Sequence, residues 1–104
     1  MNYENCLKFE LEKNGHRVKS QVEAKIIYDD FLIDTVLKVD LLVDECIVVE
    51  IKTVEKLLPV HQAQILTYMK ILEKPQGLLI NFYTDNVTKS LIPLVNEYFK
   101  KLPE

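Results

Sequence analysis

The sequence predicts an α/β fold in which a mixed β-sheet is flanked by helices, in the order αβββαβ(α). Three observations predict this fold class. Three β-rich segments follow one another between residues 17 and 53, separated by short turns, which is typical of an antiparallel meander. A segment with a helical stripe comes next, and a short apolar run of the kind that marks a buried strand follows it. A strand that is reached through a helix favours parallel pairing, so the sheet should be mixed.

The first helix is predicted over residues 3–13, where Leu7 and Leu11 approximate helical spacing among charged residues. Asn14-Gly15 should end this helix, because both residues tolerate the left-handed backbone conformation. The stop separates the helix from the first strand.

Three strands are predicted, over residues 17–28, 31–43 and 46–53. The first alternates apolar with polar residues, and the other two are rich in Leu, Ile and Val. Asp29-Asp30 and Asp44-Glu45 supply the two turns between them. Turns as short as these favour antiparallel pairing of all three strands.

A second helix is predicted over residues 61–73, with an apolar stripe along one face and Pro59 suited to the turn that begins it. Residues 76–83 form a nearly continuous apolar run, which predicts a strand buried on both faces. A right-handed crossover through the helix would bring this strand into the sheet in parallel.

A last helix is expected after Asp85-Asn86, which could cap it. Apolar residues recur in pairs from residue 91 to residue 99. Pro93 interrupts this pattern, so the helix should be confined to its C-terminal part.

Length and charge limit the function classes. The chain has 104 residues, which predicts one domain spanning residues 1–104. No apolar run approaches the roughly 20 residues needed to cross a bilayer, and the N-terminus lacks a signal-peptide core, so we expect a cytoplasmic protein with no membrane partner. The net charge of −3 is evidence against a function in nucleic-acid binding but does not exclude it. A bound metal ion or a local basic face can make a site positive on an acidic protein.

The small numbers of cysteines and glycines exclude further classes of protein and binding site. Cys6 and Cys46 are too few for a disulfide framework and are not spaced as a metal-binding pair, so they are interpreted as small core residues. The only glycines, Gly15 and Gly77, exclude a glycine-rich phosphate loop and a dinucleotide fingerprint.

The residues with the clearest chemistry are Asp40 on the second strand and Glu50 and Lys52 on the third. Glu50 and Lys52 point to one side of their strand, and the Asp44-Glu45 turn would place Asp40 close to Glu50 across the pair. Two adjacent carboxylates repel each other unless a cation lies between them, and oxygen ligands suit Mg²⁺ or Mn²⁺. A lysine on the same side can orient a metal-bound water and stabilise charge developing on a phosphate. Phosphodiester hydrolysis requires this combination.

The alternative is that Glu50 and Lys52 form an ordinary solvated ion-pair face. The strongly apolar neighbours of these residues argue against it, because they indicate a central strand. A central strand seldom carries two charges on a buried face without a use.

Three polar residues of the second helix could face the same site. Gln64 and Tyr68 are four apart on one helix face, and His61 lies one turn before Gln64. The alternative is a polar helix edge with the tyrosine half in the core. His61 on its own is interpreted as a helix-start residue.

With these residues in order, the chain resembles the GxxExxY family of the PD-(D/E)XK nuclease superfamily. The resemblance extends from about Tyr3 to Phe82. The segments that carry it are Asp40 to Val43, Val49 to Lys52, Pro59 to Tyr68 and Gly77 to Phe82. It implies a restriction-endonuclease-like core and a nuclease that uses Mg²⁺ or Mn²⁺ and acts on nucleic acid.

The resemblance also implies roles for individual residues. Asp40 and Glu50 would be the metal ligands, and Lys52 would be the catalytic lysine. Gln64 and Tyr68 match the glutamine–tyrosine motif of the RecB-like branch, which helps to position the site or the nucleic acid.

The chain departs from the family pattern at its start. The family is named for a glycine and a glutamate that precede a tyrosine in its first helix, and Tyr3 resembles that tyrosine. The glutamate would fall before the first residue, and Glu4 would project from a different side of the helix. We therefore expect one side of the metal site to be open, and the uncovered core surface would favour a homodimer.

Three functions remain open at this point. The first is a metal-dependent nuclease acting on DNA or RNA. The second is a catalytically inactive nuclease-fold module that binds metal or nucleic acid. The third is a protein-interaction domain in which the charges are structural.

Overall fold

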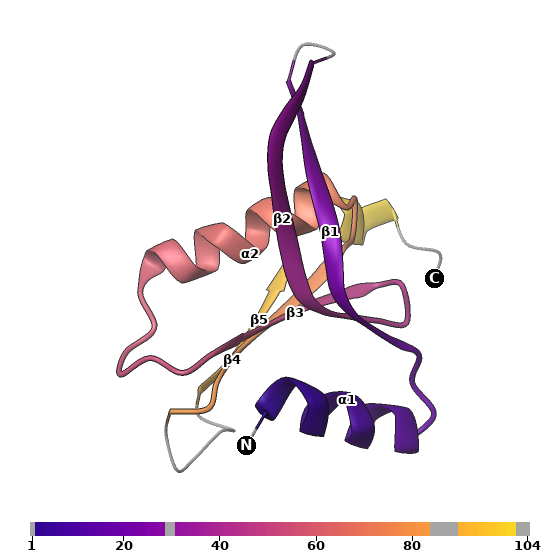
Figure 1. The fold of residues 1–104 in the computed structure, drawn as a ribbon, viewed down its shortest axis with the longest axis vertical. Helices are drawn as coiled ribbons and strands as arrows, with labels where there is room; N and C mark the ends of the chain where they lie inside the picture. The colour runs from indigo at the N-terminus through magenta and orange to yellow at the C-terminus, as the bar shows by residue number, and fades with distance from the viewer. Residues whose placement is uncertain (1, 29–30, 84–89, 102–104) are drawn as a thin grey trace.

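The computed structural model of the chain describes residues 2–28, 31–83 and 90–101. The described chain contains two α-helices, five strands and a C-terminal 3₁₀ helix (Figure 1). In chain order they are α1 (Tyr3–Lys13), β1 (Val18–Tyr28), β2 (Phe31–Val43), β3 (Ile47–Lys52), α2 (Pro59–Ile71), β4 (Gln76–Asn81), β5 (Leu91–Val95) and the 3₁₀ helix (Glu97–Lys101).

The five strands form one sheet in the order β1-β2-β3-β4-β5. β3 and β4, which α2 connects, are parallel, and the other neighbouring strands are antiparallel. The α/β fold with a mixed sheet is therefore confirmed. The predicted Asp44-Glu45 turn is also confirmed, since both residues have positive φ, 53° and 56°.

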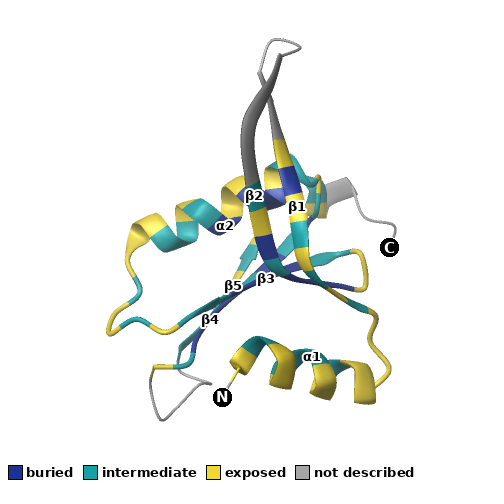
Figure 2. Ribbon diagram, viewed as in Figure 1, coloured by how far each residue is buried: buried dark blue, intermediate teal, exposed yellow. Residues whose placement is uncertain are grey.

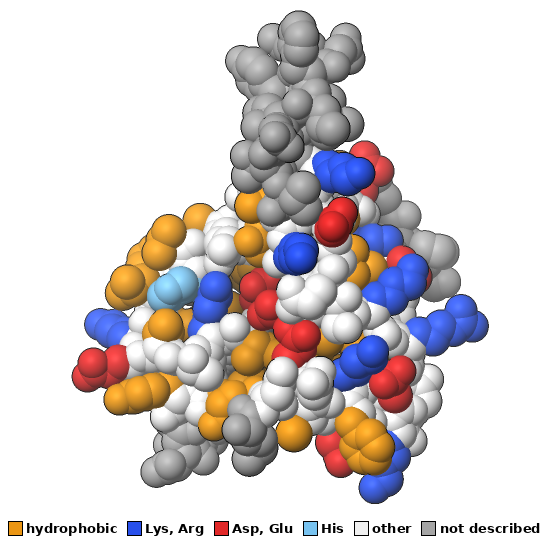
Figure 3. Space-filling view, in the orientation of Figure 1, with side chains coloured by type: hydrophobic (Ala, Val, Ile, Leu, Met, Phe, Trp, Pro, Cys, Tyr) orange, Lys and Arg blue, Asp and Glu red, His pale blue; other side chains and the backbone are white. Residues whose placement is uncertain are grey.

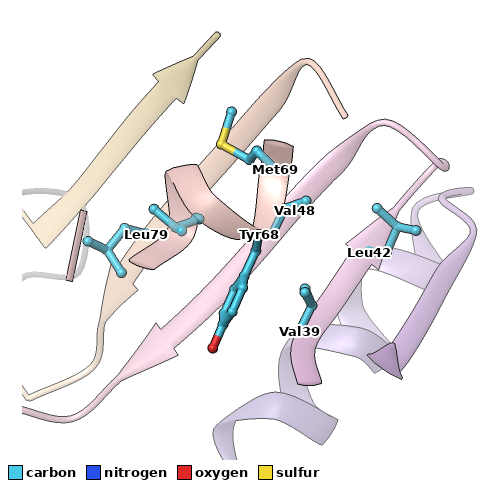
Figure 4. Packing of buried hydrophobic residues seen from close by; sticks show 7 residues of the cluster. Val39, Leu42, Val48, Tyr68, Met69 and Leu79 are labelled. Atoms are coloured by element: carbon cyan, nitrogen blue, oxygen red, sulfur yellow. The ribbon is translucent and has the colours of Figure 1, made fainter. Parts of the chain in front are cut away.

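Helix α2 covers one face of the sheet, and its residues Ile65, Tyr68 and Met69 are buried there. Figure 4 shows Tyr68 and Met69 above the sheet, near Val48 of β3. The core cluster on this face consists of Val39, Leu42, Val48, Ile65, Tyr68, Met69 and Leu79.

Helix α1 lies on the opposite face and has no buried residue (Figure 2). Leu7 and Leu11 pack against the second core cluster, which consists of Leu41, Val43, Val49 and Ile80. Tyr3 stacks on Phe82, just after β4, with ring centroids 4.6 Å apart. This contact anchors the start of α1 near the end of the sheet where β3 and β4 finish.

The predicted last helix is wrong where it covers Leu91–Val95, which forms strand β5 antiparallel to β4. Its expected cap, Asp85-Asn86, lies outside the described residues. The N–H of Asn96 donates to Pro75 O (3.3 Å), so the alternating register places Pro93 opposite Leu78 in a non-hydrogen-bonded pair. Pro93 therefore removes no bond to β4, and it leaves the outer edge of the sheet without a donor at this point.

Gly77 is the point of closest approach between β4 and α2. A Cβ atom there would lie 2.5 Å from Met69 Sδ and 3.2 Å from Ile65 Cδ1. Both side chains are fully buried, so they have little room to move. We expect Gly77→Ala to lower the free energy of unfolding by about 1–3 kcal/mol, measured by urea denaturation.

The control for this prediction is Met69→Val, which removes the sulfur that the added Cβ atom would meet. The two substitutions together should cost less than the sum of their separate effects. If the urea midpoint of Gly77→Ala were equal to or above that of the wild type, the close contact of Gly77 with Met69 and Ile65 would be contradicted.

Finally, none of the helices in the described part of the chain is long and apolar enough to span a membrane.

Candidate active site

The candidate site forms where β2 and β3 stop pairing. The ladder between them runs from Val43↔Ile47 to Leu41↔Val49, and Asp40 and Glu50 come immediately after it. Beyond this point the β1–β2 ribbon extends away from the rest of the sheet (Figure 1). The separation of the two strands leaves main-chain N–H groups without ladder partners and makes room for side chains between the strands.

The two carboxylates accept hydrogen bonds from these N–H groups. Asp40 N–H donates to Glu50 Oε1 (3.1 Å), and Ile51 N–H donates to Asp40 Oδ2 (2.8 Å). Each acid is thus held by the strand that carries the other. The close pair that the sequence predicted is present in the structure.

Glu50 is a buried carboxyl with 4% of its surface exposed. Burial raises the pKa of Glu50 to about 7, and the neighbouring charge of Asp40 acts in the same direction. The main-chain N–H of Asp40 and the charge of Lys52 oppose this rise in pKa. Ionising both carboxylates is therefore costly at neutral pH unless a cation compensates for their charge.

Lys52, Gln64 and Tyr68 form a chain of hydrogen bonds between β3 and α2. Lys52 Nζ donates to Gln64 Oε1 (2.8 Å), and Gln64 Nε2 donates to Tyr68 Oη (2.9 Å). Burial raises the pKa of the Tyr68 hydroxyl, and the charges of Glu50 and then Asp40 raise it further. The structure therefore brings all five predicted residues into one site.

The donor set fits a hard divalent cation. The oxygen atoms of Asp40 and Glu50 are the ligands that Mg²⁺ or Mn²⁺ prefers. Within residues 2–28, 31–83 and 90–101, no group of three or more His, Cys, Asp or Glu residues could hold a metal ion. Two carboxylates suit Mg²⁺, which is commonly bound through one or two carboxylates with water and substrate phosphates completing its coordination.

The first helix is joined to β1 through Glu4. Its carboxylate accepts a hydrogen bond from Gln21 Nε2 of β1 (2.7 Å). Gln21 has a φ of 53° and lies between the residues of β1 that pair with Leu41 and Val39, so it faces Asp40 across the ladder. Positive φ in a residue other than glycine is uncommon and often occurs at functional sites. The sequence pattern around Gln21 indicated only its place in an alternating strand.

Asn81 also has a structural role that the apolar pattern of its strand did not predict. It is buried at the end of β4, and its side chain binds Val54 twice, accepting from Val54 N (3.1 Å) and donating to Val54 O (2.7 Å). Phe82 N–H donates to Lys52 O (2.8 Å). These bonds fix the main chain on both sides of Thr53, and so they hold the end of β3 that carries Lys52. An asparagine that ends an apolar strand was the available signal, because buried polar side chains need partners.

Comparison with models of protein families gives a match for this chain. The family model described as PD-(D/E)XK nuclease superfamily matches residues 1–92. The chain belongs to the PD-(D/E)XK nuclease superfamily. The matched segment of this PD-(D/E)XK chain includes both carboxylates, Lys52 and the two polar residues of α2. No curated protein and no solved structure gives a significant match to the chain.

Proposed function

We propose that this PD-(D/E)XK chain is a divalent-metal-dependent nuclease that hydrolyses phosphodiester bonds of DNA or RNA. One observation carries the proposal. A hydrogen-bonded acid pair, in which Glu50 is buried and Asp40 half-buried, and a lysine held by a glutamine meet where two strands separate, in a chain of a nuclease superfamily. The cofactor would be Mg²⁺ or Mn²⁺.

Each residue has a role in this proposal. Asp40 and Glu50 would hold the cation, which when bound supplies a Lewis acid and lowers the pKa of a coordinated water. Lys52 places its ammonium group on the same side of β3 as Glu50, where it can stabilise negative charge developing on the phosphate. Gln64 accepts from Lys52 and donates to Tyr68, so it limits the positions that the ammonium group can adopt.

We further infer that the chain belongs to the GxxExxY family within this superfamily. The glutamine and tyrosine of α2 support this assignment, because they lie in one hydrogen-bonded chain with Lys52. The apolar strand β4, which ends in Asn81, supports it as well. A cytoplasmic location and a homodimer stay predictions from the sequence.

The proposal is tested first by calorimetric titration of Mn²⁺. We expect wild-type protein to bind Mn²⁺, and Glu50→Gln and Asp40→Asn each to weaken binding by at least about tenfold, because each removes one of only two charged ligands. Glu45→Gln is the matched control, since Glu45 is half exposed at the turn and pairs with Lys19 and Lys74 instead. Equal Mn²⁺ affinity in the wild type and in Glu50→Gln would contradict the proposed metal site.

Cleavage of labelled DNA and RNA, single-stranded and duplex, then tests turnover. Mg²⁺-dependent products that disappear on chelation and in Asp40→Asn would support a nuclease. An activity that persists equally in Asp40→Asn would identify a contaminant and defeat the proposal.

A second candidate is a metal-binding or nucleic-acid-binding module without catalysis. The observation that favours it is that Asp40 and Glu50 each accept a main-chain hydrogen bond, so they help to organise the strands without a metal. This candidate predicts Mn²⁺ or nucleic-acid binding with no cleavage of any substrate. Metal-dependent turnover would exclude it.

A further inference from the structure

A surface pocket lies beside the candidate site, along the exposed side of α2. The side chains of Lys52 and Gln64 contribute to both the site and the pocket. The residues that line the pocket are Lys52, Val60, His61, Ala63, Gln64 and Thr67. Figure 3 shows this side of the molecule, with acidic side chains near the middle and lysine and histidine side chains toward the start of α2.

The pocket carries side-chain donors suited to an anion although the whole chain is acidic, with a net charge of −3. Its lining includes an ammonium group, an imidazole and an amide, and none of its lining residues is acidic. The first turn of α2 has no acidic residue either, so no carboxylate of that turn competes with an incoming anion.

His61 enters this pocket with its tautomer already fixed. The N–H of Leu58 donates to His61 Nδ1 (2.9 Å), and a main-chain N–H can only donate. Nδ1 is therefore unprotonated, and the neutral ring carries its proton on Nε2. One nitrogen caps α2, and the other remains as a hydrogen-bond donor on a ring that lines the pocket.

We propose that this pocket binds a phosphate of the nucleic-acid strand, next to the phosphate that is cut, and that the Nε2–H of His61 donates to one of its oxygen atoms. The inference rests on the proposed nuclease function. Lys52 connects the two places, since it lies on the same side of β3 as Glu50 and also lines the pocket. A strand with one phosphate at the acid pair would therefore pass its neighbouring phosphate over His61. In this role His61 is a positioning residue.

The test compares His61→Asn with the wild type. Asparagine has an acceptor at the δ position, so it can still cap α2 through Leu58 N–H. Its own N–H₂ group lies at the position of the imidazole Cδ2, one bond short of the Nε2–H that reaches into the pocket. Gln62→Ala is the matched control, because Gln62 is in the same turn of α2 but does not line the pocket. Binding is measured by fluorescence anisotropy with short labelled DNA and RNA oligonucleotides in Ca²⁺.

We expect His61→Asn to weaken oligonucleotide binding by about tenfold or more, as for a lost hydrogen bond to a charged acceptor, with an unchanged thermal midpoint. The salt dependence of binding should keep its slope, because a neutral imidazole releases no counterion, whereas Lys52→Met should reduce the slope. A methylphosphonate scan locates the contact. At one position of the oligonucleotide, replacing the phosphate by an uncharged methylphosphonate should weaken binding by the wild-type protein. The same replacement should have much less effect on binding by His61→Asn.

The outcomes separate this inference from the proposed function. Metal-dependent cleavage with equal affinity and KM in the wild type and in His61→Asn would overturn the inference and leave the nuclease intact. If His61→Asn and Gln62→Ala lose affinity equally, or if His61→Asn has a lowered thermal midpoint, His61 has only a structural role. Either result would also overturn the inference. If the wild type binds no oligonucleotide, the proposed function fails and the inference fails with it.

Discussion

Replacing Lys52 by methionine should lower the rate of metal-dependent phosphodiester cleavage by at least about a hundredfold, the scale of losing one charged group that stabilises a transition state. Methionine keeps most of the length of the side chain but removes the ammonium group. Glu50 and Asp40 would still hold the cation, so Mn²⁺ affinity should change little compared with the loss in rate. The measurement is kcat/KM on a labelled oligonucleotide, with the Mn²⁺ affinity of the same preparation measured by calorimetry.

Lys70→Met is the matched control for this prediction. Lys70 is exposed on α2, outside the pocket and the hydrogen-bonded chain that Lys52 joins. Its substitution removes the same charge from the protein, and we expect cleavage to remain near the wild-type rate. Equal rates in Lys52→Met and in the wild type would refute a catalytic role for Lys52.

The stability of the metal-free protein should fall as pH rises from about 5 to about 7, by about 2 kcal/mol from Glu50 alone. The pKa of Glu50 is about 7 in the folded protein, against an ordinary value of 4.5. Between these two values the folded state binds the proton more tightly than the unfolded state does. Raising the pH through this range therefore favours unfolding, and above it Glu50 is ionised in both states.

Urea denaturation across this pH range measures the effect, and Glu50→Gln provides the control. A glutamine cannot ionise, so the contribution of Glu50 is the difference between the two stability profiles. Asp44 does not contribute to the change in stability over this pH range. The main-chain N–H of Arg17 and the side chain of His16 form hydrogen bonds with its carboxylate, and they lower the pKa of Asp44 below the ordinary value of 3.8. Adding Mn²⁺ at the upper end of the range should restore stability to the wild type but not to Glu50→Gln. Parallel profiles for the two proteins would show that Glu50 is not perturbed.

Local sequence patterns were enough to predict most of the elements. The short turn at Asp44-Glu45 fixed the register of the β2–β3 hairpin, and that register brings Asp40 next to Glu50. The period of the apolar residues identified α2 and two residues of its buried face, Ile65 and Met69, but Leu66 of the same predicted stripe is exposed. The placement of Gln64 and Tyr68 on one helix face followed from the same period. Their assignment as site residues stays a prediction until variants are measured.

The sequence by itself thus determined the mixed α/β fold and the residues that could carry chemistry, because turns and periodicity are local properties of the chain. The tertiary structure decided the rest. Leu91–Val95 became a strand because β4 offered it an open edge, and a short apolar segment has no preference strong enough to resist such pairing. The bonds of Gln21 to Glu4 and of Asn81 to Val54 join residues far apart in the sequence, so only the folded chain could bring them together.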